Sequence, residues 1–311
     1  MNGPRTWFRT ANAATLRAAA LTAVLVAGLV VALTQVPLPL QARAFPVAGQ
    51  SVVALPDESR LLVQQEHGIA IVDAATGEVT AMVSLGTLVP NPGIAIAPGA
   101  SQAVVLATTD RQEPLTVTVD VDRAVVTSVT ALDVVSAGRV GDLRPLGVDP
   151  TGAAIIRGSV ESARTVGADR QMWRSAFDGV EGVPGSGPDS YQHLSIAPGG
   201  RLLYAANERR ALVVDTATKQ IQRDLRLGSG TGPAVMPQDW TVLLAADGEH
   251  VFTSDPGDPW ITVRTLDGDP VAAIDAGARM GAGGIALSPD GAALYAALAD
   301  RLLAVDVGAY T

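Results

Sequence analysis

The chain contains no cysteine and few aromatic or charged residues. Without cysteine there can be no disulfide, thiolate metal ligand, cysteine nucleophile or lipid-modified cysteine anchor. Aromatic residues make up 4% of the chain, so any that lie near a surface are informative. Charged residues account for 17%, below the roughly 25% of an average domain, whereas apolar residues reach 48% and are ample for a core. A disulfide scaffold is excluded, and an ordinary apolar core is expected.

Charge is divided unevenly along the 311 residues. Of the 22 basic residues, four arginines lie in residues 1–44, which contain no acidic residue. The remaining chain has 18 basic and 31 acidic residues, a formal charge of −13. A body this acidic repels phosphate backbones, so nucleic acid is not an expected partner.

An apolar segment follows the first arginines of the chain. Arg5, Arg9 and Arg17 precede residues 18–33, which are apolar or small apart from one threonine. Positive charge before an apolar run keeps the N-terminus in the cytoplasm and directs the chain after the run outward. We therefore expect a cytoplasmic basic segment, a transmembrane or signal-anchor helix and an extracytoplasmic domain, at residues 1–17, 18–40 and 41–311 respectively.

The same segment allows a second interpretation, in which it is a cleaved signal. Ala42-Arg43-Ala44 has the A-x-A form of a signal-peptidase site, and cleavage there would leave Phe45 at the new N-terminus. The apolar length lies between a signal core and the roughly 20 residues that span a membrane. We expect a single-pass protein of the cell membrane, with secretion after cleavage near Ala44 as the alternative.

The most regular feature is a recurring phrase: a short apolar run, Pro-Asp-Gly or a near relative, and a second apolar run. The phrase occurs at residues 52–57, 94–99, 146–152, 194–200, 242–248 and 285–291. Counted from the proline, or from the alanine that replaces it once, successive copies are 42 to 52 residues apart. A period in this range is typical of propeller blades.

One repeat predicts four strands. Residues 194–227 contain four apolar or alternating runs separated by turn residues, the pattern of an antiparallel meander. Pro198-Gly199-Gly200 supplies the backbone conformations of a tight turn, and Asp215 can close a second turn through its side chain. We therefore predict an all-β fold, a six-bladed β-propeller of four-stranded antiparallel blades. Because the third and fifth repeats are weak, seven blades remain the alternative.

The repeats resemble the YVTN-type β-propellers, which are related to WD-repeat and lactonase-type propellers. The matching segments are 288–295, 197–207, 214–218 and 72–77. The resemblance covers residues 50 to 311 and implies a secreted or surface-associated propeller architecture. It implies no catalytic residue, because no catalytic motif of the related enzymes has a counterpart here.

The final repeat has only three strands before the chain ends at Thr311. A missing fourth strand would leave an exposed sheet edge, which native proteins avoid. Residues of about 42–47 precede the first strand and can fill this place. We therefore expect the N-terminal residues of the domain to pair with the last repeat.

The connections predict where binding takes place. Within each repeat the tight turns follow the first and third strands, so both lie at the same end of the strands, on one rim of the propeller disc, here called the tight-turn rim. Longer, irregular connections are expected after the second and fourth strands, at the opposite end of the strands. This opposite rim is called the long-loop rim, and such loops commonly carry function. The candidate contact residues on this rim are Tyr191, His193, Trp240, Trp260, Arg144 and His67.

Catalytic and metal-binding signatures are lacking. The three histidines, His67, His193 and His250, have no metal-ligand spacing, and His250 is expected at the start of a second strand. Gly228-Ser-Gly-Thr-Gly232 is followed by Pro233 and lacks the Gly-Lys-Ser/Thr of a phosphate loop. We expect no metal, no cofactor and no catalytic residue.

Two functions from different classes are consistent with these features. The first is a binding module for a protein or a glycan, held to the membrane by the N-terminal helix. The alternative is a lactonase-like hydrolase or lyase with a metal-dependent site at the mouth of the central channel. Fold alone does not decide between them.

Overall fold

The computed structural model describes the greater part of the chain that follows the N-terminal segment. The described residues are 41–96, 101–111, 113–131, 144–148, 154–157, 173–175, 193–197, 200–207, 210–226, 241–255 and 258–310. They form β-strands and one short 3-10 turn, η4 (Gly308–Tyr310). This content confirms that the domain is all-β, as predicted.

The sheets are numbered here in chain order. The first, second, fourth and fifth sheets follow the predicted pattern of four-stranded antiparallel meanders, and the last sheet reaches four strands with a strand from the N-terminal end of the domain. The first sheet comprises β2 (Ser51–Ala54), β3 (Arg60–Gln65), β4 (Gly68–Asp73) and β5 (Val79–Ser84). The second comprises β6 (Val89–Ile96), β7 (Gln102–Thr108), β8 (Pro114–Asp120) and β9 (Val125–Ala131). The fourth comprises β13 (His193–Ile196), β14 (Leu202–Asn207), β15 (Arg210–Asp215) and β16 (Gln220–Arg226). The fifth comprises β17 (Thr241–Leu244), β18 (His250–Ser254), β19 (Trp260–Thr265) and β20 (Pro270–Asp275).

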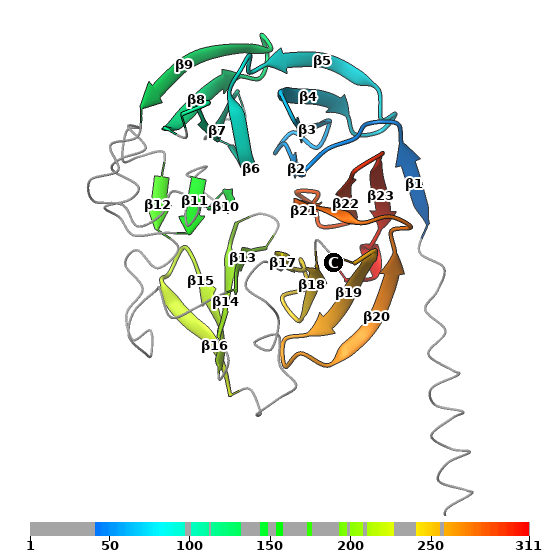
Figure 1. Cartoon of the computed structure of the whole chain (residues 1–311). Coiled ribbons are helices and arrows are strands. Elements are labelled where there is room, and N and C mark those ends of the chain that lie inside the picture. Colours follow the sequence, from blue (N-terminus) through cyan, green and yellow to red (C-terminus); the bar gives the residue numbers. More distant parts are fainter. Residues whose placement is uncertain are drawn as a thin grey trace, which may run out of the picture. The chain divides into compact units, whose positions relative to one another are not determined.

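The last sheet is closed by the beginning of the domain, as predicted. It contains β21 (Met280–Leu287), β22 (Ala293–Leu298) and β23 (Leu302–Asp306), and its fourth strand is β1 (Ala42–Phe45). Strand β1 runs antiparallel to β23, with Ala42 opposite Val305 and Phe45 opposite Leu302. The two ends of the domain therefore share one sheet (Figure 1).

The third sheet departs from the expected antiparallel meander. Strands β10 (Arg144–Val148) and β11 (Ala154–Arg157) pair antiparallel, but β11 pairs parallel with β12 (Trp173–Ser175). Only three strands of this sheet lie within the described residues. A parallel pair requires a crossover connection rather than a tight turn, so the long third repeat does not follow the antiparallel path of the others.

The first strand of each sheet is its inner strand, and the six inner strands contact one another in a closed order. Strand β2 contacts β6, β6 contacts β10, and the series continues through β13 and β17 to β21. Strand β21 returns to β2 through a single parallel bridge between Gly283 and Ser51. Figure 1 shows these strands towards the middle and β5, β9, β16 and β20 at the outside. Each recurring phrase of the sequence supplies part of an inner strand, and the arrangement fits a propeller-like fold.

The turn after the inner strand is the same in four sheets. In the fifth sheet Ala245 donates its N–H to the carbonyl of His250, and Gly248 donates to the carbonyl of Ala245. Gly248 has a φ of 66°, and glycines occupy this place in the fourth and last sheets as well. In the first sheet the place is taken by Glu58, with a φ of 59°. This left-handed conformation is unfavourable for any residue with a Cβ.

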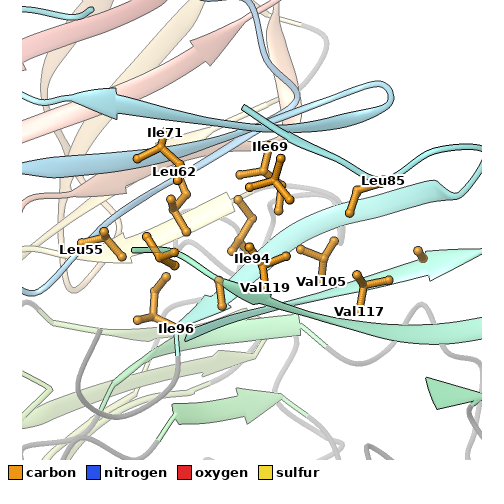
Figure 2. Close-up of a cluster of buried hydrophobic side chains, with 14 residues drawn as sticks. Leu55, Leu62, Ile69, Ile71, Leu85, Ile94, Ile96, Val105, Val117 and Val119 are labelled. Carbon is orange, nitrogen blue, oxygen red and sulfur yellow. The ribbon is translucent and has the colours of Figure 1, made fainter. Parts of the chain in front are cut away.

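The core lies between the faces of neighbouring sheets. One cluster, drawn in Figure 2, joins the first and second sheets through buried aliphatic side chains such as Leu62, Ile69, Val105 and Val117. Further clusters join the fourth sheet to the fifth, the fifth to the last, and the last to the first. Successive side chains of a strand point to opposite faces, so β4, which is buried along most of its length, contributes Ile69 and Ile71 to one cluster and Ala70 and Val72 to another.

The predicted helix at residues 18–40 lies outside the described residues. In the part of the chain that the structure describes, no helix is long and apolar enough to cross a membrane. The chain divides into two compact units, Met1–Pro39 and Leu40–Thr311, and the strands described above belong to the second unit. The membrane segment and the cleavage site therefore remain predictions.

Candidate binding surface

The long-loop rim differs from the prediction in one respect. The connections after the second strand are not uniformly long, because residues 66–67 and 208–209 alone join β3 to β4 and β14 to β15. The connections after the fourth strand do vary, from residues 85–88 to the much longer 227–240. On the tight-turn rim, by contrast, every connection from an inner strand to its neighbour has the same length. The connections that differ most in length, apart from the one between the parallel strands β11 and β12, therefore lie where the chain passes from one sheet to the next.

Charged side chains on the tight-turn rim bind one another across sheets. Arg60 lies 2.7 Å from the carboxylate of Asp57 and 2.9 Å from that of Asp122, which belongs to the second sheet. Arg223 of the fourth sheet lies 3.1 Å from Glu249 of the fifth. Exposed pairs of this kind contribute about 1 kcal/mol or less each to stability. Their hydrogen-bonding groups are nevertheless occupied within the chain.

The aspartates that close the turns after the third strands are similarly occupied. Oδ1 of Asp73 accepts hydrogen bonds from the backbone N–H groups of Thr76 and Ala75 and from the Thr76 hydroxyl. The backbone hydrogen bond from Thr76 is the main reason that the pKa of Asp73 lies below its ordinary value. Asp215 makes the equivalent bonds with Thr218 and Ala217, and its pKa is lowered for the same reason. These carboxylates form the turns and are not available to a ligand.

The structure places four of the six candidate residues. His67 lies in the turn between β3 and β4 with its side chain 69% exposed. Trp260 is the first residue of β19, and Arg144 and His193 are the first residues of the inner strands β10 and β13. Tyr191 and Trp240 lie outside the described residues, as do the side chains of Arg144 and His193.

The candidate residues do not form one cluster. Because β10 and β13 contact each other, the backbones of Arg144 and His193 begin neighbouring inner strands. His67 and Trp260 instead lie at the ends of third strands in the first and fifth sheets, further from the middle. A ligand that touches all of them would have to cover much of the rim.

Trp260 is the best-defined candidate anchor. Its side chain is 48% exposed, although tryptophan is usually well buried. Its backbone is opposite that of Asp275 in the ladder between β19 and β20, and the carbonyl of the preceding Pro259 accepts a hydrogen bond from Ala276. Asp258, two residues earlier, is exposed as well. The indole is therefore held on a paired strand, with carboxylates before it in the chain and opposite it in the ladder.

The neighbouring connection is fixed by Arg301 of the last sheet. Nη2 of Arg301 donates to the carbonyl of Ala276 at 3.0 Å, and its Nη1 lies 3.0 Å from Asp300. A Cβ on Gly277 would lie 2.8 Å from the same guanidinium, and Gly277 has a φ of 71°. The rim beside Trp260 is thus formed by two sheets bonded to each other.

The starts of the inner strands contain contacts that the sequence interpretation missed. Gln64 is wholly buried, and its side-chain oxygen accepts the N–H of Gly93 in the second sheet at 3.1 Å. A Cβ on Gly281 would lie 2.4 Å from the carbonyl oxygen of Gln50, so the first and last sheets approach closely there. The glycine-rich run 281–284, within the first half of β21, was the available signal for this close approach.

A serine joins the fourth and fifth sheets in the same way. Oγ of Ser195, on β13, accepts the backbone N–H of Leu244, on β17, at 2.7 Å, and both groups are buried. Ser195 is a small residue between the larger Leu194 and Ile196, which suits an inner strand where neighbouring sheets crowd together. The polar contact shows that such a residue also satisfies the neighbouring backbone.

No metal site is formed by the residues with described positions. Among them, no group of three or more histidine, aspartate or glutamate side chains could hold a metal ion. His250 begins β18, as predicted, and its Nδ1 lies 2.6 Å from Asp247 while its ring meets that of Tyr310 edge-on. This histidine holds together the turn of the fifth sheet and the C-terminal 3-10 turn.

Comparisons with known proteins add little to this description. No protein-family model matches the chain, so the YVTN-type resemblance stays a prediction. No curated protein matches it. Among solved structures it is similar to Kuenenia stuttgartiensis hydrazine synthase, with a TM-score of 0.48 and 16% identity over 85% of this chain and 96% of that one. A likeness of this degree implies nothing about the chemistry of the chain.

Proposed function

We propose that this protein is an extracytoplasmic binding module that recognises a protein or a glycan through its long-loop rim. The recognition domain is a six-bladed propeller of the YVTN type, and residues 18–40 connect it to the membrane. No catalytic step belongs to this proposal.

Trp260 carries the proposal. A tryptophan that is half exposed on a hydrogen-bonded strand offers a large rigid apolar face at low entropic cost, which is why such residues dominate binding energies. Its flat face suits the C–H face of a sugar ring or an aliphatic or cationic side chain. Asp258 lies two residues before Trp260, and Asp275 is opposite it in the ladder. Their negative charges disfavour an acidic ligand and favour a neutral or basic one.

The difference between the two rims supports the choice of surface. On the tight-turn rim, Arg60 and Arg223 bind carboxylates of neighbouring sheets, and Asp73 and Asp215 close their own turns. These groups would have to give up internal bonds before they could bind anything else. On the long-loop rim Arg301 and Asp275 are also bonded within the chain, but the half-exposed indole of Trp260 can be contacted without breaking any of these bonds.

The six-bladed architecture rests on the closed order of contacts. Six inner strands contact one another from β2 to β21 and back to β2, and β1 supplies the fourth strand of the last sheet. Closure through strands from both ends of the domain is one way in which an all-β fold removes its exposed edges. The third sheet is the blade whose strand order deviates from the others.

Binding is tested with matched substitutions on the fifth sheet. Purified full-length protein would be applied to a glycan array, and cross-linked partners would be captured from intact cells that produce it. For whichever ligand is found, Trp260→Ala should weaken binding about 30-fold, which corresponds to roughly 2 kcal/mol. Val271→Ala is the control, since Val271 is 39% exposed on β20 of the same sheet but lies away from the first residue of β19.

Two outcomes contradict the proposed surface. Equal binding by the wild-type protein and Trp260→Ala would exclude Trp260 as the anchor. Loss of binding in Thr76→Ala, with its melting temperature preserved, would place the ligand on the tight-turn rim instead.

A further inference from the structure

The candidate signal-peptidase site lies inside a strand of the folded domain. Ala42-Arg43-Ala44 forms the first three residues of β1, and the bond that would be cut joins Ala44 to Phe45, the last residue of that strand. We propose that this bond stays intact and that residues 1–44 remain part of the mature protein. The N-terminal segment is then a permanent tether, joined to the domain through its closing strand.

Cleavage would remove most of the pairing between β1 and β23. Ala42, Arg43 and Ala44 are opposite Val305, Ala304 and Leu303. The carbonyl of Gln41 also accepts the N–H of Asp306 at 2.9 Å, and Arg43 donates to the carbonyl of Ala75 at 3.3 Å. All of these contacts lie on the N-terminal side of the bond in question.

Without β1, strand β23 would become an edge strand with buried apolar side chains. Leu302, Leu303 and Val305 are all buried. Without β1, the backbone groups of this strand that now face β1 would be open to solvent and to other chains. The closing strand therefore protects an apolar sheet that has no other fourth strand among the described residues.

The residue that would become the new N-terminus is buried. Phe45 is 6% exposed and belongs to a cluster of side chains from the first and last sheets, together with Val47, Leu61 and Tyr295. Its ring occupies the space above Gly77, where a Cβ would lie 2.1 Å from the ring. A new α-amino group at Phe45 would carry a positive charge at neutral pH, and burying it beside this cluster is unfavourable. Folding and cleavage at this bond thus oppose each other.

This inference rests on the proposed extracytoplasmic placement, because only an exported chain meets signal peptidase. It decides between the two fates that the sequence leaves open, a membrane-held protein and a secreted one. It does not depend on which ligand the long-loop rim binds.

A matched pair of substitutions tests it in the full-length protein. Signal peptidase requires a small residue before the cut, so Ala44→Ser keeps the site and Ala44→Leu destroys it. Because the side chain of Ala44 is exposed, both variants should fold. The chains would be expressed in bacterial cells, separated into membrane and soluble fractions, and measured by intact mass.

We expect wild type, Ala44→Ser and Ala44→Leu to retain residues 1–44 and to remain in the membrane fraction. The inference is overturned if wild type and Ala44→Ser begin at Phe45 while Ala44→Leu keeps its N-terminal segment. It is also overturned by a soluble mature chain cut upstream of β1, which would keep the strand but lose the tether.

Protease added to spheroplasts separates this inference from the proposed function. Digestion of an uncut, membrane-bound chain from outside supports both. A chain that begins at Phe45 and is digested from outside contradicts the tether, and with it the membrane attachment, but leaves the extracytoplasmic binding role intact. An uncut chain that is fully protected contradicts the extracytoplasmic placement, and the tether falls with it.

Discussion

Replacing Phe45 with alanine should destabilise the domain more than any other single truncation in β1. The ring is 6% exposed and packs between the first and last sheets, where it fills the space above Gly77. Alanine at this position keeps the backbone pairing with Leu302 but leaves a cavity in the seam, the apolar cluster between the first and last sheets. The perturbation therefore isolates the side chain that holds the two ends of the domain together.

Truncation of a buried phenylalanine to alanine typically costs about 3–5 kcal/mol of unfolding free energy. For a domain of this size, each 1 kcal/mol lowers the melting temperature by roughly 2–4 °C. We therefore expect the melting temperature of Phe45→Ala to fall by about 6–20 °C. The packing around the missing ring can relax only partly, because Gly77 is held in its turn by the hydrogen bond that its N–H donates to the carbonyl of Asp73.

The assay is thermal and urea unfolding of the full-length protein followed by circular dichroism. Met82→Ala is the matched control, since Met82 lies on the outermost strand of the first sheet but is 51% exposed. Its unfolding free energy should change by about 0.5 kcal/mol or less. If Phe45→Ala behaves like Met82→Ala, the seam does not depend on β1 and the reasoning about closure is wrong.

Two further predictions concern the turns. Glu58→Gly should stabilise the protein by roughly 0.5–1 kcal/mol, because glycine relieves the left-handed conformation that three other sheets already assign to glycine; an unfolding free energy that falls instead would mean that Glu58 makes a compensating contact. Stability should also fall in acid: hydrogen bonds lower the pKa of Asp73 and Asp215, from backbone N–H groups first, and that of Asp290, from the Ser288 hydroxyl first. Because these pKa values are lower in the folded than in the unfolded state, their contribution is complete above about pH 5 and is lost as pH falls through the unfolded and then the folded values. Urea unfolding between pH 7 and pH 3 should show this decline, and Asp290→Asn should reduce it; constant stability down to pH 3 would contradict the assignment.

The repeated strands and their turns were predictable because both depend on residues close together in the sequence. Short apolar runs bounded by turn residues specify the strands, and Ala245 to Gly248 specify their turn by local hydrogen bonds. The closing role of residues 42–47 was also predictable, since a three-stranded last repeat requires a partner and the chain provides one directly before the first strand.

The candidate site was less predictable because it depends on how the sheets meet. The sequence indicated Trp260 as a candidate, but its half-exposed indole and its pairing with Asp275 follow from the packing of β19 against β20. The parallel pairing of β11 with β12 could not be inferred either, because strand direction is set by partners distant in the chain.

Sequence alone determined the strand pattern, the acidic character of the domain and the presence of an apolar segment before it. Tertiary structure decided which polar side chains serve the interior, as Gln64 and Ser195 do by bonding to backbones of neighbouring sheets. It also decided that Ala42-Arg43-Ala44, a cleavage motif by composition, is a paired strand in the folded protein. A cleavage motif depends on a few adjacent residues. The stability that cleavage there would remove depends instead on pairing with residues about 260 positions away, which only the closed fold brings together.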